Sequence, residues 1–279
     1  MKKILITGSS GLVGSETVEF FYKKKFKIYA LDNDLRSLLF GKESSTLSLK
    51  KYQKEKYPSI NFLNLDITNY NKLESVFVEN KFDIIVHTAG QPSHDWSAKD
   101  PILDFKVNAL GTLNLLELTR KYCPKTVFIY TSTNKVYGDS PNFIKGLKEL
   151  KTRYEVYKDK KLFSINEKFS IDDSKHSPFG VSKAAGDLYV QEYGKYFGIK
   201  TISFRCGCIT GPNHKGAELH GFLSYLVSCI IKNKHYQIFG YKGKQVRDNI
   251  HARDLVQMFW YAYKNPGYGE IYNAGGGRS

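Results

Sequence analysis

Two side chains spaced one helical turn apart are the first residues here that could do chemistry. In the segment HSPFGVSK, residues 176–183, Phe179 stands four positions before Lys183. If the segment is helical, both side chains share one face. A lysine ammonium lowers the pKa of a neighbouring acid, but a phenyl ring has no proton to give or take. The pair therefore has the layout of an acid–base couple with one inert member.

A glycine-rich loop is the second chemical feature. In TGSSGLVG, residues 7–14, Gly8, Gly11 and Gly14 follow a strand-like run and open a helical pattern. Glycines let the backbone turn tightly and approach a pyrophosphate, whose charge meets the amino terminus of the helix. Alone, the spacing could serve only a tight turn. Followed by Asp32 at the end of the next strand-like run, it predicts a dinucleotide-binding βαβ unit.

Asp32 also indicates which dinucleotide binds. A carboxylate at this point can accept hydrogen bonds from both hydroxyls of the adenosine ribose and repels a 2′-phosphate. We therefore expect NAD rather than NADP, although Arg36 lies close enough in the sequence to keep NADP open.

The elements that position these residues follow from periodicity. Short β-branched runs alternate with helical patterns, which predicts a parallel sheet covered by helices on both faces. The expected strands are 4–7, 27–31, 60–65, 83–87, 126–131 and 201–206, and the expected helices are 11–24, 71–79, 102–122, 183–196 and a segment ending near 231. Two polar stretches, 33–59 and 139–175, read as surface excursions near strand ends. The predicted fold class is α/β, a Rossmann-type doubly wound sheet.

Composition narrows the function classes. The net charge of +15 favours polyanionic partners, but the lysines are scattered and no nucleic-acid motif accompanies them, so we expect no nucleic-acid partner. No apolar run is long enough to span a bilayer, so no membrane partner is expected. The four cysteines and seven histidines show no metal-ligand spacing, so we expect no metal, reduced thiols and a cytoplasmic protein.

With these motifs in view, the chain resembles the extended short-chain dehydrogenase/reductases, specifically the NAD-dependent epimerase/dehydratase family. Further similar segments are Asp66-Ile67, HTAGQ (87–91), Asn108, TSTNKVYGD (131–139), FRCGCITGPN, GKQVRDNIHARDLV and NAGGG. Several of them look closest to the CDP-tyvelose (CDP-paratose) 2-epimerases. The resemblance implies NAD as cofactor, held by Gly8, Gly11, Leu12, Val13, Gly14, Asp32, Asn33, Asp66, Ile67, Ala89, Gly90, Gln91, Asn108 and Lys183.

The same resemblance implies a catalytic set of Thr133, Lys183 and position 179. In that family a tyrosine one turn before the lysine takes the proton of a sugar hydroxyl while hydride leaves for NAD, and the keto sugar is then reduced on its other face. Phe179 occupies the tyrosine position. The related 4,6-dehydratases carry Asp-Glu where this chain has Asn134-Lys135, which counts against a dehydratase.

Three explanations of Phe179 stay open. Another group could accept the proton, with His176, Cys206 and His94 as candidates. The chain could be a non-catalytic relative that binds NAD or a nucleotide sugar. Finally, the phenylalanine could have been introduced to trap a complex.

Our overall expectation is an NAD-dependent, 2-epimerase-like enzyme acting on a nucleotide-activated sugar, with the non-catalytic binding protein as the alternative. The substrate-binding candidates are Thr133, Asn134, Arg205, Asn213 and Arg247, with Arg205 placed on the loop after its strand and Arg247 pairing with the substrate pyrophosphate. We divide the chain into an NAD-binding domain, 1–203, and an intertwined, incomplete substrate domain, 204–279, since the family usually continues beyond NAGGG. The resemblance also implies a homodimer through helices 102–122 and 179–196.

Overall fold

A seven-stranded sheet forms the centre of the protein, which we describe from a computed structural model over residues 1–151, 154–158, 161–215, 221–238 and 246–277. Its strands are β1 (Lys3–Thr7), β2 (Lys27–Leu31), β3 (Asn61–Leu63), β4 (Ile84–His87), β5 (Val127–Thr133), β9 (Lys200–Cys206) and β12 (Glu270–Ala274). They run in the order β12-β9-β5-β4-β1-β2-β3, and every pair is parallel. The strand order reverses between β1 and β4, which confirms the doubly wound prediction.

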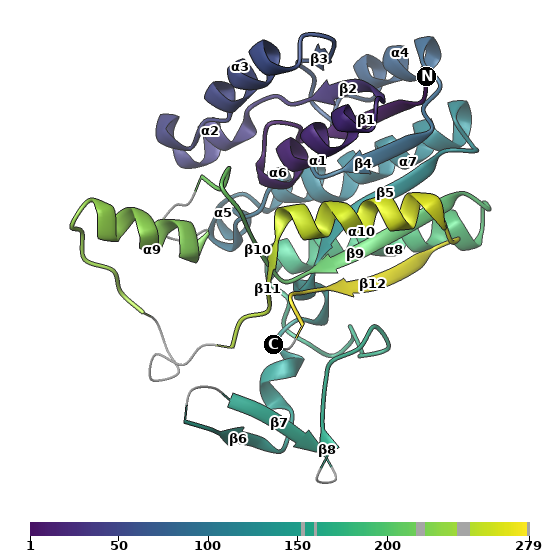
Figure 1. Ribbon diagram of the computed structural model, residues 1–279. Helices are drawn as coiled ribbons and strands as arrows, with labels where there is room; N and C mark the ends of the chain where they lie inside the picture. The colour runs from purple at the N-terminus through teal and green to yellow at the C-terminus, as the bar shows by residue number, and fades with distance from the viewer. Residues whose placement is uncertain (152–153, 159–160, 216–220, 239–245, 278–279) are drawn as a thin grey trace.

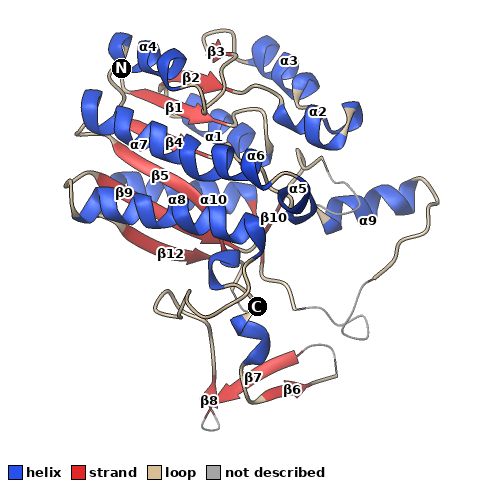
Figure 2. Ribbon diagram, turned by 180° about the vertical axis from the view of Figure 1, so that it is seen from behind, coloured by secondary structure: helices blue, strands red, loops and turns tan. Residues whose placement is uncertain are grey.

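Helices cover both faces of this sheet (Figures 1 and 2). On one face, α1 (Leu12–Lys23) and α10 (Ala252–Lys264) share a core with Ile4 and Ile6 of β1. On the other, Leu5 packs among residues of α4 (Tyr70–Glu79), α7 (Gly111–Tyr122) and α8 (Ser177–Lys195). Successive side chains of a strand point to opposite faces, so the apolar run Ile4–Ile6 of β1 serves two cores at once.

The stretch 33–59, expected as a surface excursion, contains two helices. These are α2 (Leu35–Phe40), followed by a 3₁₀ turn, η1 (Lys42–Ser44), and α3 (Leu47–Lys56). The buried residue of α3 is Gln53, whose amide donates to Ser9 O at 3.1 Å. A polar contact to the glycine-rich loop therefore fixes this helix. Because α3 lacks an apolar stripe, its residue pattern does not predict a helix.

The helix expected over 102–122 is interrupted. Short helices α5 (His94–Lys99) and α6 (Pro101–Phe105) lead into a π-helical turn, η2 (Lys106–Leu110), before α7. Asn108 lies in that turn and bonds the backbone of Gln91 twice, accepting from its N–H at 2.9 Å and donating to its carbonyl at 3.0 Å. The asparagine thus ties the widened turn to the chain after β4, where a π-bulge often marks a functional site.

The remaining elements lie around the carboxyl ends of the strands. After β5 come two 3₁₀ turns, η3 (Asn134–Tyr137) and η4 (Ser140–Phe143), and a small antiparallel sheet of β6 (Leu147–Glu149), β7 (Tyr154–Lys158) and β8 (Lys161–Leu162), which stands apart from the main body (Figure 1). Strands β10 (Cys208–Thr210) and β11 (Asn249–His251) pair in parallel, and α9 (Phe222–Ile231) extends to one side. The domain boundary expected at residue 203 falls inside β9, and β12 completes the central sheet, so both parts share that sheet.

Candidate active site

The glycine-rich loop is shaped so that side chains would not fit. Gly8 has a φ of +66°, and a Cβ there would lie 2.8 Å from the Ala89 backbone. A Cβ on Gly14 would overlap the Gly8 carbonyl oxygen. These two glycines therefore let the loop fold onto itself and onto the chain after β4.

Helix α1 begins directly after this loop with its first amides uncapped. Its N-cap is Gly11, which offers no side chain to accept hydrogen bonds from the amides of Leu12, Val13 and Gly14. The first N–H groups of a helix have no acceptor within the helix and carry partial positive charge. The loop and helix end thus form the cradle that a pyrophosphate requires.

Residues expected to hold the adenosine meet at the carboxyl ends of β2 and β3. Asp32 is buried and accepts from Ser10 N–H and from Asp34 N–H, each at 2.9 Å. The Asn33 amide donates to the Asp66 carboxylate at 3.1 Å. These polar side chains follow two neighbouring, paired strands and line one edge of the sheet.

Two other residues near this end have structural partners. Ile67 is buried and packs against Gly111, where even a methyl group would overlap it. The Arg36 guanidinium donates to Lys215 O at 2.8 Å, and burial lowers its pKa. Arg36 is therefore committed to the backbone, which favours NAD over NADP.

Lys183 lies at the opposite end of the same edge. It is 7% exposed, donates to Thr131 O at 2.7 Å and stands 4.3 Å above the centre of the Tyr130 ring. Burial lowers its pKa to about 8. A Cβ on Gly90 would come 3.0 Å from Asn108 Oδ1 and 3.9 Å from Lys183 Nζ, so the missing side chain keeps space open beside the ammonium.

Two buried hydroxyls at the carboxyl end of β5 support a ligand at this edge of the sheet. Within the described residues, Thr131 Oγ1 and Ser132 Oγ have no hydrogen-bond partner. Such atoms are rare in native proteins and are explained by a ligand or water. The glycine cradle, Asp32 and this cluster together fit a nicotinamide dinucleotide laid along the carboxyl edge of the sheet.

Thr133 ends β5 and begins η3. Its Oγ1 accepts from Lys135 N–H at 3.2 Å, and its side chain is half-buried, while the neighbouring Asn134 is exposed. A cavity of about 190 Å³ opens beside η3, lined by residues that include His94, Lys135, Asp139, Lys175, His176 and Ser177. The two substrate candidates Thr133 and Asn134 directly precede Lys135, which lines this cavity, but neither is among its lining residues.

Phe179 is 8% exposed on the first turn of α8, and an aromatic neighbour covers it. The ring centres of His94 and Phe179 lie 4.7 Å apart in an edge-to-face arrangement. The phenylalanine thus fills the place expected for a tyrosine, and a histidine from α5 lies on it.

Two of the three candidate replacement bases are committed elsewhere. Both ring nitrogens of His176 lie near backbone carbonyls, Ser174 O at 2.7 Å and Val136 O at 2.9 Å. Cys206 is buried, and burial raises its pKa to about 12. Neither can take a proton from a substrate at neutral pH, which leaves His94.

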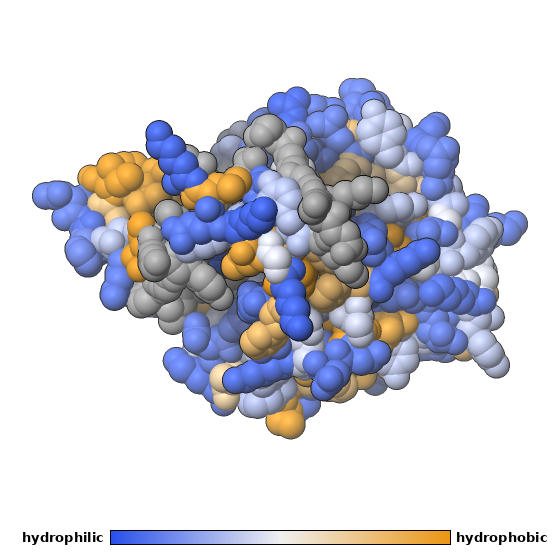
Figure 3. Space-filling view, turned by 90° about the horizontal axis from the view of Figure 1, so that it is seen from below, coloured by the Kyte–Doolittle hydropathy of each residue, from blue (hydrophilic) through white to orange (hydrophobic). Residues whose placement is uncertain are grey.

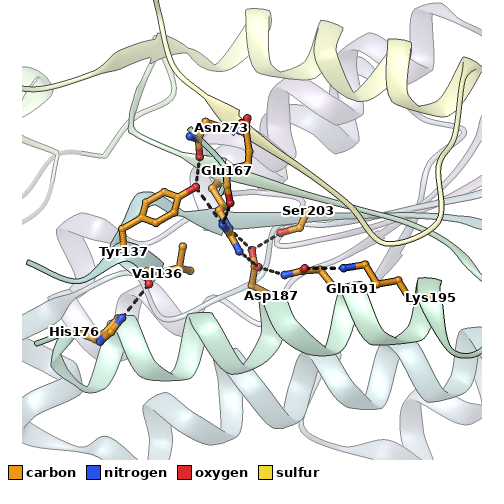
Figure 4. Close-up of polar contacts among 10 residues, drawn as sticks. Val136, Tyr137, Glu167, His176, Asp187, Gln191, Lys195, Ser203 and Asn273 are labelled. Atoms are coloured by element: carbon orange, nitrogen blue, oxygen red, sulfur yellow. Dashed lines mark hydrogen bonds and ion pairs between the residues drawn. The ribbon is translucent and has the colours of Figure 1, made fainter. Parts of the chain in front are cut away.

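Arg205 is a correction to the sequence expectation. It lies inside β9 rather than on the following loop, is 4% exposed and bonds the Asp187 carboxylate at 2.8 Å. Its Nη1 also donates to Tyr137 Oη at 3.1 Å. Figure 4 shows the network around Asp187 and Tyr137, which reaches Ser203, Gln191, Glu167 and Asn273. The guanidinium therefore holds β9, α8 and η3 together and is closed to substrate.

The other substrate candidates differ in position. Asn213 donates to Ser15 Oγ at 3.1 Å, beside the start of α1. Arg247 is exposed, lies 6.0 Å over the Phe222 ring and contributes to lowering the pKa of His94. Of the two residues, Arg247 is the charged one, and its charge acts on His94, which lines the cavity beside η3.

Sequence reasoning missed two residues of the site. Gln53 supports the glycine-rich loop from a helix that carries no apolar stripe. Ser177 contacts His94 through its hydroxyl at 3.0 Å, a contact between residues far apart in sequence. The segment HSPFGVSK contained Ser177, but no spacing rule links it to residue 94.

Fold and site together define a class of protein: a coenzyme-binding enzyme of the short-chain dehydrogenase/reductase type. The sequence matches the model of the NAD dependent epimerase/dehydratase family over residues 4–275, and the chain belongs to this family. No group of His, Cys, Asp and Glu among the described residues is arranged to hold a metal, and no described helix is long and apolar enough to cross a membrane.

Three relatives show the range of activities nearby. CDP-paratose 2-epimerase of Salmonella typhi is 32% identical over 98% of this chain and 79% of its own length. dTDP-glucose 4,6-dehydratase of Salmonella typhimurium is 28% identical over 98% of this chain and 72% of its own. The crystal structure of Thermus thermophilus UDP-glucose 4-epimerase in complex with NAD superposes with a TM-score of 0.74 at 28% identity, covering 99% of this chain and 78% of that one. Epimerases and dehydratases thus both resemble this chain.

Proposed function

We propose that this protein is an NAD-dependent epimerase of a nucleotide-activated sugar and that it inverts C2 of a CDP-hexose. The observation that carries the proposal is the line of groups along one edge of the sheet: the glycine cradle, Asp32, Lys183, and Thr133 at the end of β5. When bound, NAD supplies the reversible acceptance of hydride from a sugar carbon.

The chain's own residues have separate roles in this scheme. The cradle and Asp32 bind the coenzyme, and Lys183 fixes its ribose next to the reacting carbon. Thr133 hydrogen-bonds the sugar hydroxyl that is oxidised. Arg247, exposed near the cavity, offers a guanidinium fork to the substrate pyrophosphate. Positioning of this kind removes much of the entropic part of the barrier.

An epimerase is favoured over a dehydratase by the residues after Thr133. Expelling water from a hexose requires an acid and a base, and the exposed Asn134 amide supplies neither. Lys135, which lines the cavity, is a cation rather than a carboxylic acid. The 2-epimerase assignment further rests on the likeness to CDP-paratose 2-epimerase.

A second candidate function is a protein that binds NAD or a nucleotide sugar without turnover. The buried Phe179 favours it, because the position one turn before Lys183 has no ionisable group. Both candidates place the protein in the cytoplasm and without a nucleic-acid or membrane partner.

The two functions separate in one experiment. The purified protein is titrated with NAD and NADP by calorimetry and then incubated with CDP-paratose, UDP-glucose and dTDP-glucose while products are followed by NMR. We expect tighter binding of NAD and inversion at C2 of CDP-paratose, without a 4-keto-6-deoxy product from dTDP-glucose. Uptake of NAD with no change in any sugar nucleotide would favour the binding protein.

A further inference from the structure

The proposed epimerase needs a proton acceptor that Phe179 cannot be. When hydride leaves a carbinol carbon, the hydroxyl proton must pass to a base, and a positioned base contributes about 10²- to 10⁴-fold to the rate. Lys183 is bonded to Thr131 O, His176 faces two carbonyls and Cys206 is buried. The search for a base therefore turns to the residue lying on Phe179.

His94 is held against the start of α8 by two contacts. Its ring packs edge-to-face on Phe179, and its Nδ1 lies 3.0 Å from Ser177 Oγ. Nε2 has no hydrogen-bond partner among the described residues, and the ring lines the cavity beside η3. One ring nitrogen is thus oriented by a hydroxyl while the other remains available, the arrangement that a histidine base requires.

The backbone at Ser177 is strained in support of this contact. Its φ of +65° lies in the left-handed region, which is unfavourable for a residue with a side chain and persists where the surroundings impose it. The His176 ring anchors the same turn, donating toward Val136 O of η3 (Figure 4). The strained turn therefore presents Ser177 Oγ to His94 from a fixed position.

The charges around His94 favour its neutral form. His94 is an exposed residue whose ring is partly covered by Phe179 and Ser177. This desolvation lowers its pKa below the ordinary 6.5, and the Lys135 and Arg247 cations lower it further, against an opposing effect of Asp95. Other titratable groups that line the same cavity are Asp139, Lys175 and His176. A neutral imidazole at pH 7 can accept a proton.

We propose that His94, oriented by Ser177, replaces the family's tyrosine as the proton acceptor; this inference rests on the proposed function. The sugar O–H bond breaks as its proton passes to His94 Nε2, the C–H electron pair leaves as hydride to NAD⁺, and a C=O bond forms. With NAD bound, hydride would return to the other face of the carbonyl carbon, and the His94 imidazolium would return the proton to the sugar oxygen. Proton, hydride and coenzyme are all restored at the end of the cycle.

The direct test compares His94→Asn with His235→Asn, the replacement of an exposed histidine outside the site. For His94→Asn we expect unchanged uptake of NAD and a fall in kcat of about 10²- to 10⁴-fold, while His235→Asn keeps wild-type kcat. Wild-type kcat/KM falls as the pH drops through the pKa of His94, below 6.5, since the protonated ring cannot accept a proton. This acid limb disappears in His94→Asn.

A readout independent of turnover uses the protein without coenzyme. In ¹⁵N-histidine NMR, we expect the His94 signals to titrate below pH 6.5 and their tautomer ratio to change in Ser177→Ala, a positioning variant. His94 signals that titrate at the ordinary value and do not respond to Ser177→Ala would contradict the oriented imidazole.

Adding Phe179→Tyr gives the rescue arm. Alone, Phe179→Tyr changes kcat less than about tenfold, because a base already exists; added to His94→Asn, it recovers at least about tenfold, because a phenol again stands one turn before Lys183. An active wild type matched by an equally active His94→Asn overturns this inference alone. A wild type that takes up NAD but inverts no sugar overturns the proposed function as well.

Discussion

At the scale of single residues, the site concentrates groups whose placement opposes stability. Lys183 is a buried cation with one carbonyl acceptor, and Ser177 has strained backbone. Two buried hydroxyls at the end of β5, Thr131 Oγ1 and Ser132 Oγ, have no partner among the described residues. Enzymes commonly accept such local penalties where ligands bind. The candidate site residues were the feature most readily predicted from the sequence. The glycines, Asp32, Lys183 and the inert Phe179 could all be named from their spacing.

The burial of Lys183 predicts a pH-dependent stability. Its pKa is about 8 when folded and near 10.5 ordinarily, so its charge penalises the folded state below pH 8, and the penalty is relieved as the pH rises from 8 to 10.5. Relative to Lys183→Met, we expect the wild-type free energy of unfolding without coenzyme to gain roughly 1–3 kcal/mol across this window. Urea denaturation at pH 7, 8, 9 and 10 measures it. Parallel pH curves for the two proteins would contradict the buried charge.

At the scale of elements, several contacts hold the first turns of helix α8 against the turn η3. Gly180 has no side chain, and a Cβ there would lie 3.1 Å from Lys135 O, so the helix approaches the turn closely. His176 binds Val136 O, and Arg205 links Asp187 of α8 to Tyr137 of η3. The catalytic helix and the turn after Thr133 are therefore positioned together.

The buried Arg205–Asp187 pair is predicted to be a structural link. Arg205→Met leaves the Asp187 carboxylate buried with no cation, which costs about 3–5 kcal/mol of unfolding free energy. The double variant Arg205→Met/Asp187→Leu should recover most of this loss. As a control, Arg120→Met removes an exposed pair with Glu117 and costs less than about 1 kcal/mol. A stable Arg205→Met that loses only substrate affinity would restore the substrate role first expected.

Elements were predictable from sequence where apolar residues form a run or a helical period. The sheet strands, α1 and α4 have such patterns, whereas α3 is anchored through Gln53 and the π turn at Asn108 depends on a contact with Gln91. Arg205 lies within the strand predicted over 201–206 rather than on the loop after it, and its pairing with Asp187 of α8 could not be predicted from either segment alone. Likewise, the approach of His94 to Phe179 arises from how α5 packs on α8, which no local pattern encodes.

At the scale of the whole molecule, exposed apolar side chains gather on two surfaces of the described residues. One lies on α6, η2 and α8, which pack together, and comprises Ile102, Phe105, Leu110, Val181, Leu188 and Tyr189. The other is α9, with Leu223, Val227, Ile230 and Ile231, at one end of the molecule in Figure 3. Elsewhere the face in Figure 3 is largely hydrophilic. Exposed apolar patches of this kind mark interaction surfaces.

We predict that the α6–α8 surface forms a homodimer. Replacing Val181 and Leu188, 55% and 49% exposed, by lysine places charges in that interface, and sedimentation should show the dimer converting to monomer. Val78→Lys on α4, 56% exposed and outside both apolar surfaces, serves as control and should leave the mass unchanged. A wild type that sediments as a monomer at micromolar concentration would contradict the predicted dimer.

Transient oxidation by NAD at the inverted carbon is the claim on which the whole account depends, and one isotope experiment tests it most directly. The protein with NAD is given CDP-paratose carrying deuterium at C2 in ordinary water, and the product is examined by NMR. We expect a product that is inverted at C2 and keeps its deuterium, because the hydride returns to the carbon it left. Loss of the deuterium to solvent during inversion would contradict it.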